Sequence, residues 1–76
     1  MNAVERNRLK WKCRRGLLEL DLVLQDFVER RMTEEDVGPL NELLALEDND
    51  LWDIVSGRSD RFDARYGGIV ARLRAV

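Results

Sequence analysis

Residues 12–31 read KCRRGLLELDLVLQDFVERR, and this stretch decides the fold. After Gly16, apolar residues recur three and four positions apart, which places their side chains on one face of an α-helix. A helix is therefore predicted from about Leu17 to Arg31. Acids in its first turn and arginines in its last suit the helix dipole. The predicted core stripe consists of Leu17, Leu20, Leu24, Phe27 and Val28, with Val23 beside it.

The segment before Gly16 predicts another helix, from about Ala3 to Arg14. Its apolar residues are sparse, so it is expected to lie on the surface. Glycine adopts the left-handed backbone conformation that closes a helix without a steric cost from Cβ. Gly16 should therefore end this helix and form a sharp corner with the next one.

A third helix is expected soon after residue 31, but its start has two possible positions. Thr33 can act as the N-cap of the acidic run that follows it. Pro39 would then lie too deep in the helix, where its ring clashes with a carbonyl. A start at Asp36 instead places Pro39 in the first turn. Leucines 40, 43, 44 and 46 supply the buried face in either case.

Two more short helices are predicted in the last third of the chain. One runs from about Asp50 to Ser56, with Asp48 or Asn49 as its cap and Gly57 as its end. The other runs from about Arg61 to Ala75. Within it, the pair Gly67-Gly68 indicates either close helix packing or a frayed start, since glycine disfavours helix interiors.

The predicted fold class is all-α: one small domain over residues 1–76, a compact bundle of about five short helices. With a single cysteine, Cys13, no disulfide can form within the chain. The domain must therefore depend on apolar packing, for which 45% apolar residues suffice. Cys13 is expected to be half-buried, and a lone cysteine fits a reducing compartment.

Charge is strongly segregated along the chain. Residues 1–15 carry a net +5, residues 16–57 a net −10 and residues 58–76 a net +3. This pattern has two interpretations of equal standing: a bipolar surface that orients a partner, or oppositely charged helices that attract each other within the fold.

No segment is expected to enter a membrane. The longest apolar-rich stretch, Leu17 to Val28, is interrupted by acids and is too short to span a bilayer. The N-terminal residues lack the apolar core of a secretory signal. They contain Glu5 and no serine, unlike a transit peptide. The expected location is therefore a bacterial cytoplasm.

The residues needed for most catalysis and metal binding are missing. The chain has no histidine, the commonest general base, so Cys13 has no histidine partner to form a thiolate. Zinc needs three or four Cys or His ligands, and the acidic run 47–50 lacks the spacing of a calcium loop. The basic first segment, with Trp11, could contact nucleic acid, but the overall pI of about 5.1 argues against it. We expect neither an enzyme nor a metalloprotein.

The corner at residues 12–21 remains the most unusual feature. It combines Arg14 and Arg15 with Gly16 and, in the next turn, Glu19 and Asp21. A purely structural explanation is available, since glycine caps one helix and the charges suit the two helix dipoles.

The same corner resembles the RGxxE signature of the SdhE-like flavinylation factors of succinate dehydrogenase and fumarate reductase. Residues 11–21, WKCRRGLLELD, carry the resemblance. Residues 43–52, LLALEDNDLW, are similar to the acidic-then-aromatic segment before that family's fourth helix. The resemblance covers about residues 4 to 74. Gly38-Pro39, Ile54 and Gly67-Gly68 depart from the family pattern.

The resemblance implies a non-enzymatic assembly factor that binds the flavoprotein subunit and promotes covalent attachment of FAD to a histidine of that subunit. It implies that no cofactor stays on this chain, and we expect the chain to be a monomer. Arg15 would bond to partner groups near the flavin, Gly16 would allow close approach, and Glu19 would pair with a partner cation or orient Arg15. The residues expected to flank the contact are Arg14, Trp11, Asp48 and Trp52.

Two other functions remain open at the level of sequence. The first is direct flavin binding, with Trp11 or Trp52 stacked on the ring; a core this small leaves little room for such a pocket. The second is a regulatory, antitoxin-like module that binds a different protein.

Overall fold

The computed structural model describes residues 2–76, and across that range its regular structure is helical throughout. The five α-helices are α1 (Ala3–Lys12), α2 (Leu18–Asp26), α3 (Val37–Leu43), α4 (Asp48–Val55) and α5 (Gly67–Arg74). A π-helical turn, η1 (Phe27–Arg31), extends α2, and 3-10 turns η2 (Glu34–Asp36) and η3 (Ala64–Tyr66) precede α3 and α5. The prediction of an all-α fold with five short helices is confirmed.

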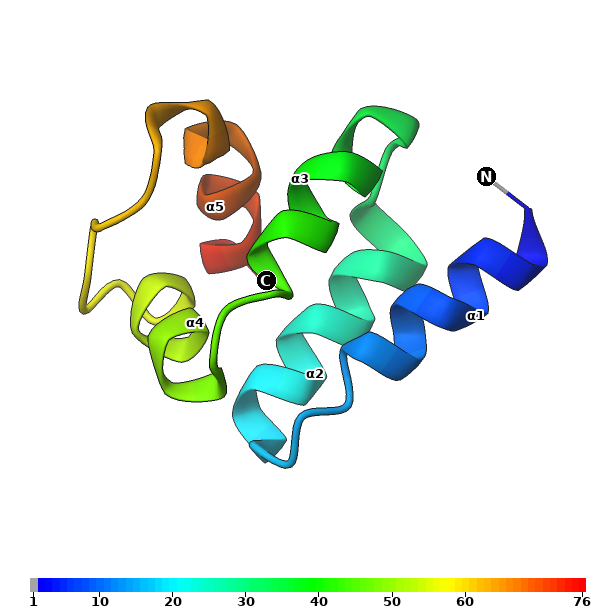
Figure 1. The fold of residues 1–76 in the computed structure, drawn as a ribbon, viewed down its shortest axis with the longest axis horizontal. Helices are drawn as coiled ribbons and strands as arrows, with labels where there is room; N and C mark the ends of the chain where they lie inside the picture. Colours follow the sequence, from blue (N-terminus) through cyan, green and yellow to red (C-terminus); the bar gives the residue numbers. More distant parts are fainter. Residues whose placement is uncertain (1) are drawn as a thin grey trace.

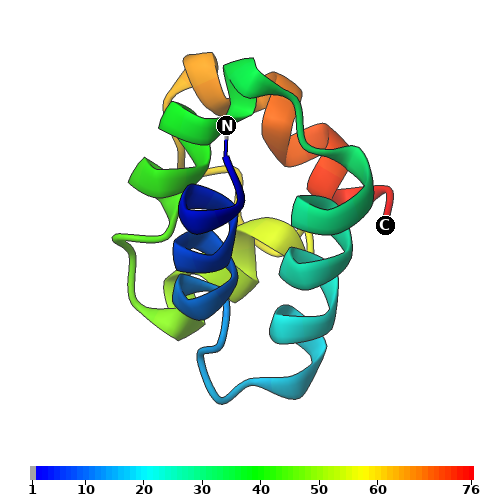
Figure 2. The same ribbon diagram turned by 90° about the vertical axis from the view of Figure 1, so that its right-hand side faces the viewer.

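The helices form two groups along the long axis of the molecule (Figure 1). Helices α1 and α2 run side by side in opposite directions, joined by the corner at Gly16, and α4 and α5 lie together at the other end, with α3 between the groups. Figure 2 shows α1 on the outside of this arrangement. The radius of gyration, 11.3 Å, agrees with the value of about 11 Å expected for a folded chain of this length.

One apolar core joins all five helices. Each helix contributes at least one residue with an exposed fraction below 4%: Leu9, Leu20, Leu40, Leu51 and Leu73 in chain order. The predicted stripe of α2 is confirmed in its centre, since Leu20, Leu24 and Phe27 are completely buried. Its margins, Leu17 and Val23, are only partly buried and pack against the core.

The first two helices are shorter than predicted. Helix α1 ends at Lys12 instead of Arg14, and α2 begins at Leu18. The predicted single helix to Arg31 changes at Phe27 into the π-helical turn, which closes with a 2.8 Å hydrogen bond from the N–H of Met32 to the carbonyl of Phe27. The wider turn keeps Phe27 and Val28 in the core.

Both predicted starts of the third helix are present in the structure, one after the other. Thr33 is the N-cap of η2, and Asp36 is the N-cap of α3. Pro39 is the third residue of α3, within the first turn, where a missing N–H costs no helical hydrogen bond. Asp36 is buried; its carboxylate accepts hydrogen bonds from the Thr33 N–H at 2.9 Å and from both terminal nitrogens of Arg72.

The observed bounds of the last two helices also differ from the predicted ones. Helix α4 begins at Asp48, with Glu47 as an N-cap that makes no side-chain bond, so the predicted cap by Asp48 or Asn49 is wrong. Gly57, with φ of +88°, follows α4 as predicted. The last helix was predicted to begin at Arg61, but residues 61–63 are not helical, η3 follows them, and Gly67-Gly68 form the first turn of α5. A Cβ at either glycine would meet nothing within 4 Å, so close packing does not explain them.

No helix within residues 2–76 has the length and apolar character needed to cross a membrane.

Candidate partner-binding site

The corner between α1 and α2 is built on Gly16. Cys13 caps α1, and the backbone then turns through Gly16, whose φ is +85°, before α2 begins. Residues with a Cβ rarely adopt this left-handed conformation. The predicted conformational role of Gly16 is therefore confirmed. Gly16 is also exposed, so its backbone is accessible to another molecule.

Asp21 holds the corner from the first turn of α2. One carboxylate oxygen accepts the backbone N–H of Arg15 at 2.8 Å, and the other accepts that of Gly16 at 3.3 Å. Bonds from N–H groups to an ionised carboxylate are stronger than neutral ones. Asp21 thus satisfies two backbone donors between the helices and fixes the path of the turn.

The guanidinium of Arg15 is used inside the protein. Its Nε donates to the carboxylate of Asp48 at 2.6 Å, and its Nη1 donates to the carbonyl of Leu44 at 2.8 Å. Nη2 donates to the carbonyl of Leu46, and a longer bond of 3.3 Å joins Nη1 to the carbonyl of Lys12. Only 13% of the Arg15 side chain is exposed. Arg15 therefore ties the corner to the loop between α3 and α4.

The Arg15 guanidinium is therefore directed at its own chain and does not extend freely into solvent. Four of its hydrogen bonds end on groups of its own chain. Glu19 does not orient it either, because the contacts around Arg15 come from Asp21 and Asp48. Asp48 is itself 40% exposed at its side chain, so it can be reached from outside. Partner contact by these residues stays a prediction.

Glu19 and Trp52 lie on one groove next to the corner. The groove has a volume of about 300 Å³ and is lined by Leu17, Leu18, Glu19, Leu20 and Trp52. The carboxylate of Glu19 is exposed and, across residues 2–76, makes no ion pair or hydrogen bond. Trp52 is half-buried and packs against the core. The structure thus brings together two predicted site residues from α2 and α4.

Trp11, in the last turn of α1, and Arg14, just after the helix, form a separate exposed pair. Trp11 is 69% exposed, and the guanidinium carbon of Arg14 lies 5.1 Å from the centre of its ring. This distance is within the range of a cation–π contact. Both residues are exposed and lie outside the groove at Glu19; their contact with a partner stays a prediction.

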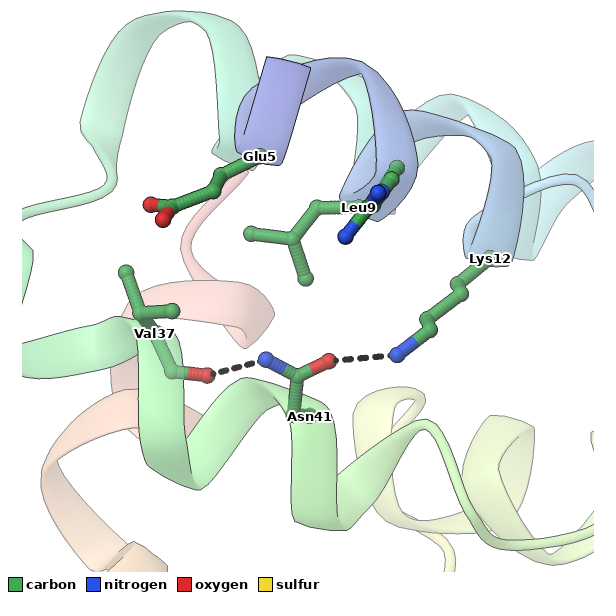
Figure 3. Close-up of a pocket in the computed structure, with 6 residues that line it drawn as sticks. Glu5, Leu9, Lys12, Val37 and Asn41 are labelled. Atoms are coloured by element: carbon green, nitrogen blue, oxygen red, sulfur yellow. Dashed lines mark hydrogen bonds between the residues drawn. The ribbon is translucent and has the colours of Figure 1, made fainter. Parts of the chain in front are cut away.

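A second groove, of about 270 Å³, lies between α1 and α3. Figure 3 shows Glu5, Leu9 and Lys12 of α1 facing Val37 and Asn41 of α3. The Asn41 amide donates to the Val37 carbonyl at 3.0 Å and accepts from the Lys12 ammonium at 3.0 Å. These bonds engage the Lys12 ammonium and the Asn41 amide in packing α1 on α3.

Cys13 is completely buried instead of half-buried. Burial raises the pKa of its thiol to about 11, against a smaller opposing effect of Arg15. A thiol with this pKa is protonated at neutral pH and is a poor nucleophile. Among residues 2–76, no cluster of three or more potential metal-ligating residues occurs.

Two exposed leucines were missed by the sequence-based site prediction. Leu18 is 72% exposed and Leu22 is 60% exposed, both on α2. A signal for them was present in the sequence, because they are the leucines of this segment that fall outside the core stripe.

The fold and this site define a class: a small helical protein with a glycine corner between its first two helices and an apolar groove beside it. Comparison with known proteins gives the family. The family described as "Flavinator of succinate dehydrogenase" matches residues 7–76. The chain belongs to this family.

Several relatives are named FAD assembly factor SdhE. The one from Methylococcus capsulatus is 40% identical over 75 residues, which cover 95% of this chain and 90% of the relative. That from Legionella pneumophila strain Lens is 43% identical over 63 residues, 79% of this chain and 80% of the relative. The Ralstonia nicotianae protein is 47% identical over 58 residues, 72% of this chain and 61% of the relative. No solved structure matches.

These matches confirm the resemblance noted in the sequence. They favour an assembly factor over the two alternatives, a regulatory antitoxin-like module and a direct flavin-binding protein.

Proposed function

We propose that this chain binds the flavoprotein subunit of succinate dehydrogenase or fumarate reductase and promotes covalent attachment of FAD to it. The observation that carries the proposal is membership of the flavinator family over residues 7–76, together with relatives named as FAD assembly factors. The chain acts without catalysis of its own, as a monomer in a bacterial cytoplasm. As the family resemblance implies, the flavin bonds to a histidine of the partner; this chain contains no histidine.

The corner supplies a fixed surface for that contact. Asp21 ties the corner to α2, and Arg15 ties it to the loop before α4. The backbone at Gly16 and Glu19 is therefore already held in place, and little backbone entropy is lost when a partner binds. Gly16 lets the partner's backbone approach closely. Glu19 forms an ion pair with an arginine or lysine of the partner. Asp48 and Trp52 flank it on one side, and Arg14 and Trp11 extend the contact toward the C-terminal end of α1.

Arg15 has two roles in this proposal. Its main role is to keep the corner in position through its internal bonds. It also places positive charge close to the partner's flavin site. The flavin itself stays with the partner throughout, so the purified chain carries no visible flavin absorbance.

The test is in-gel flavin fluorescence of the flavoprotein subunit, produced with and without this chain in cells that lack any related factor. The chain should raise the covalently bound flavin strongly. Glu19→Gln should reduce the effect, because it removes the free carboxylate but retains the shape. Glu35→Gln is a matched control, since Glu35 is an exposed acid on η2. Equal flavin fluorescence with and without the chain contradicts the proposal.

A further inference from the structure

Helix α2 exposes two leucines on the face that points away from the core. Leu18 is 72% exposed and Leu22 is 60% exposed. They are four residues apart, so their side chains are neighbours on the helix surface. Single exposed apolar residues are ordinary, but adjacent ones beside a groove mark a surface that another molecule covers.

The groove at Leu18 is lined by apolar residues except at Glu19. Leu20 is completely buried, Leu17 and Trp52 are partly buried, and the space between them is about 300 Å³. This volume is at the lower limit of pockets that hold small ligands. It therefore suits one apolar side chain of a protein better than a whole flavin nucleotide.

The edge of the groove carries an uncompensated negative charge. Glu19 makes no ion pair within residues 2–76. The neighbouring Arg15 is engaged with Asp48, and Arg30 and Arg31, the cations of the acidic segment 16–57, both pair with Asp26. The chain itself thus offers Glu19 no cation, and a molecule that covers the groove must bring one.

We propose that this groove binds a basic, apolar segment of the flavoprotein subunit. One aliphatic or aromatic side chain of that segment enters between Leu18 and Trp52, and an arginine or lysine close to it in sequence pairs with Glu19. Leu22 extends the apolar contact along α2. This inference rests on the proposed function and specifies the chemistry of the partner at the same site.

A second copy of this chain is a less suitable occupant. Stable homodimers bury roughly 800 Å² or more on each protomer, which is a large share of the total accessible surface of 4985 Å². Two leucines and one groove provide a smaller apolar area than this. A modest surface of this kind fits a partner that is released after its assembly.

The experiment measures binding of the purified full chain to the purified flavoprotein subunit, and flavin loading of that subunit in parallel. The key variant is L18Q/L22Q, because glutamine keeps the helix propensity and removes the apolar surface. The matched control is Val4→Gln, since Val4 is 59% exposed on α1 at the end far from the corner. Circular dichroism confirms that each variant is folded, which is expected because all three positions are exposed.

We expect L18Q/L22Q to weaken binding by roughly tenfold or more, at low and at high salt, because burial of apolar area is insensitive to screening. Glu19→Gln should weaken binding at low salt and much less at high salt. Val4→Gln should bind like the unmodified chain. This combination of results supports the groove as the contact.

Three results overturn the inference. If L18Q/L22Q binds and loads flavin as well as the unmodified chain, the groove is not used, although the proposed function stands. If the unmodified chain neither binds the subunit nor raises its flavin content, the proposed function is wrong, and the inferred contact at the groove is wrong with it. If the chain sediments as a dimer that L18Q/L22Q dissociates, the occupant is a second copy.

Discussion

Replacement of Arg15 by alanine should destabilise the fold itself. The substitution removes bonds to the carbonyls of Leu44 and Leu46 and to the carboxylate of Asp48. Hydrogen bonds to charged groups each contribute about 1.5–3 kcal/mol. Because Asp48 is 40% exposed and regains water, we expect a total loss of about 3 kcal/mol, less than the sum of three such bonds.

This loss is large for so small a domain. A chain of 76 residues has a free energy of unfolding of roughly 4–11 kcal/mol. Each kcal/mol shifts the Tm of such a domain by about 4–8 °C, so Arg15→Ala should lower Tm by about 12–24 °C. Urea unfolding followed by circular dichroism measures the free energy, and a thermal scan measures Tm.

Two variants make the prediction specific to the internal bonds. Arg14→Ala removes the adjacent, exposed arginine and should change stability by no more than about 0.5 kcal/mol. Arg15→Lys retains the charge but lacks the planar fork of donors, so it should fall between the other two. A loss below about 1 kcal/mol for Arg15→Ala would refute the reasoning. Flavin-loading assays of Arg15 variants must therefore be made well below the Tm of each variant.

Three further predictions follow from single residues. Gly16→Ala should lower the free energy of unfolding in urea by about 1–2 kcal/mol. The cause is backbone strain alone, because φ is +85° and no atom would clash with the new Cβ. Gly38 has no positive φ and the same open space at Cβ, so an equal loss for Gly38→Ala would contradict this. The hydrogen bond from Arg72 lowers the pKa of Asp36, so its stabilisation is complete above the unfolded pKa of about 4 and is lost as pH falls below it. Asp36→Asn should flatten the stability between about pH 6 and pH 3, and an unchanged pH dependence in this variant would contradict the prediction. Burial raises the pKa of Cys13 to about 11, so a thiol reagent should react with it only at the rate of unfolding and quickly in urea; fast reaction in the native protein would show that the site opens.

Local sequence rules were sufficient for most of the helical framework. The spacing of apolar residues located the buried centre of α2 at Leu20, Leu24 and Phe27. Gly16 and Gly57 both take the positive φ expected of residues that end a helix. Pro39 occupies a first-turn position, as the start at Asp36 required. These features depend on residues a few positions apart, so the sequence contains the necessary information.

The helix boundaries were less predictable, because packing competes with local preference there. Phe27 and Val28 have helical spacing, but the chain adopts a π-helical turn that keeps both in the core. Asp48 has the residue type of an N-cap, but it binds Arg15 from within α4. A side chain with a distant partner of opposite charge gains more from that partner than from a cap.

At the candidate site, too, some features follow from local sequence and others depend on packing between distant segments. The sequence by itself determined that a glycine corner has an arginine before it and a glutamate in the next turn, and it identified the family through that motif and the segment 43–52. It also determined that leucines 18 and 22 do not belong to the core stripe.

Only the tertiary structure decided what those side chains do. The acceptors of Arg15 lie 29 to 33 residues further along the chain, apart from the local carbonyl of Lys12. Trp52 meets Leu18 across a groove that exists because α4 packs beside the start of α2. Local propensity acts over one or two helical turns. The assignment of Arg15 to the interior and of Glu19 to the surface depends on contacts between segments, which form only when the whole core is assembled.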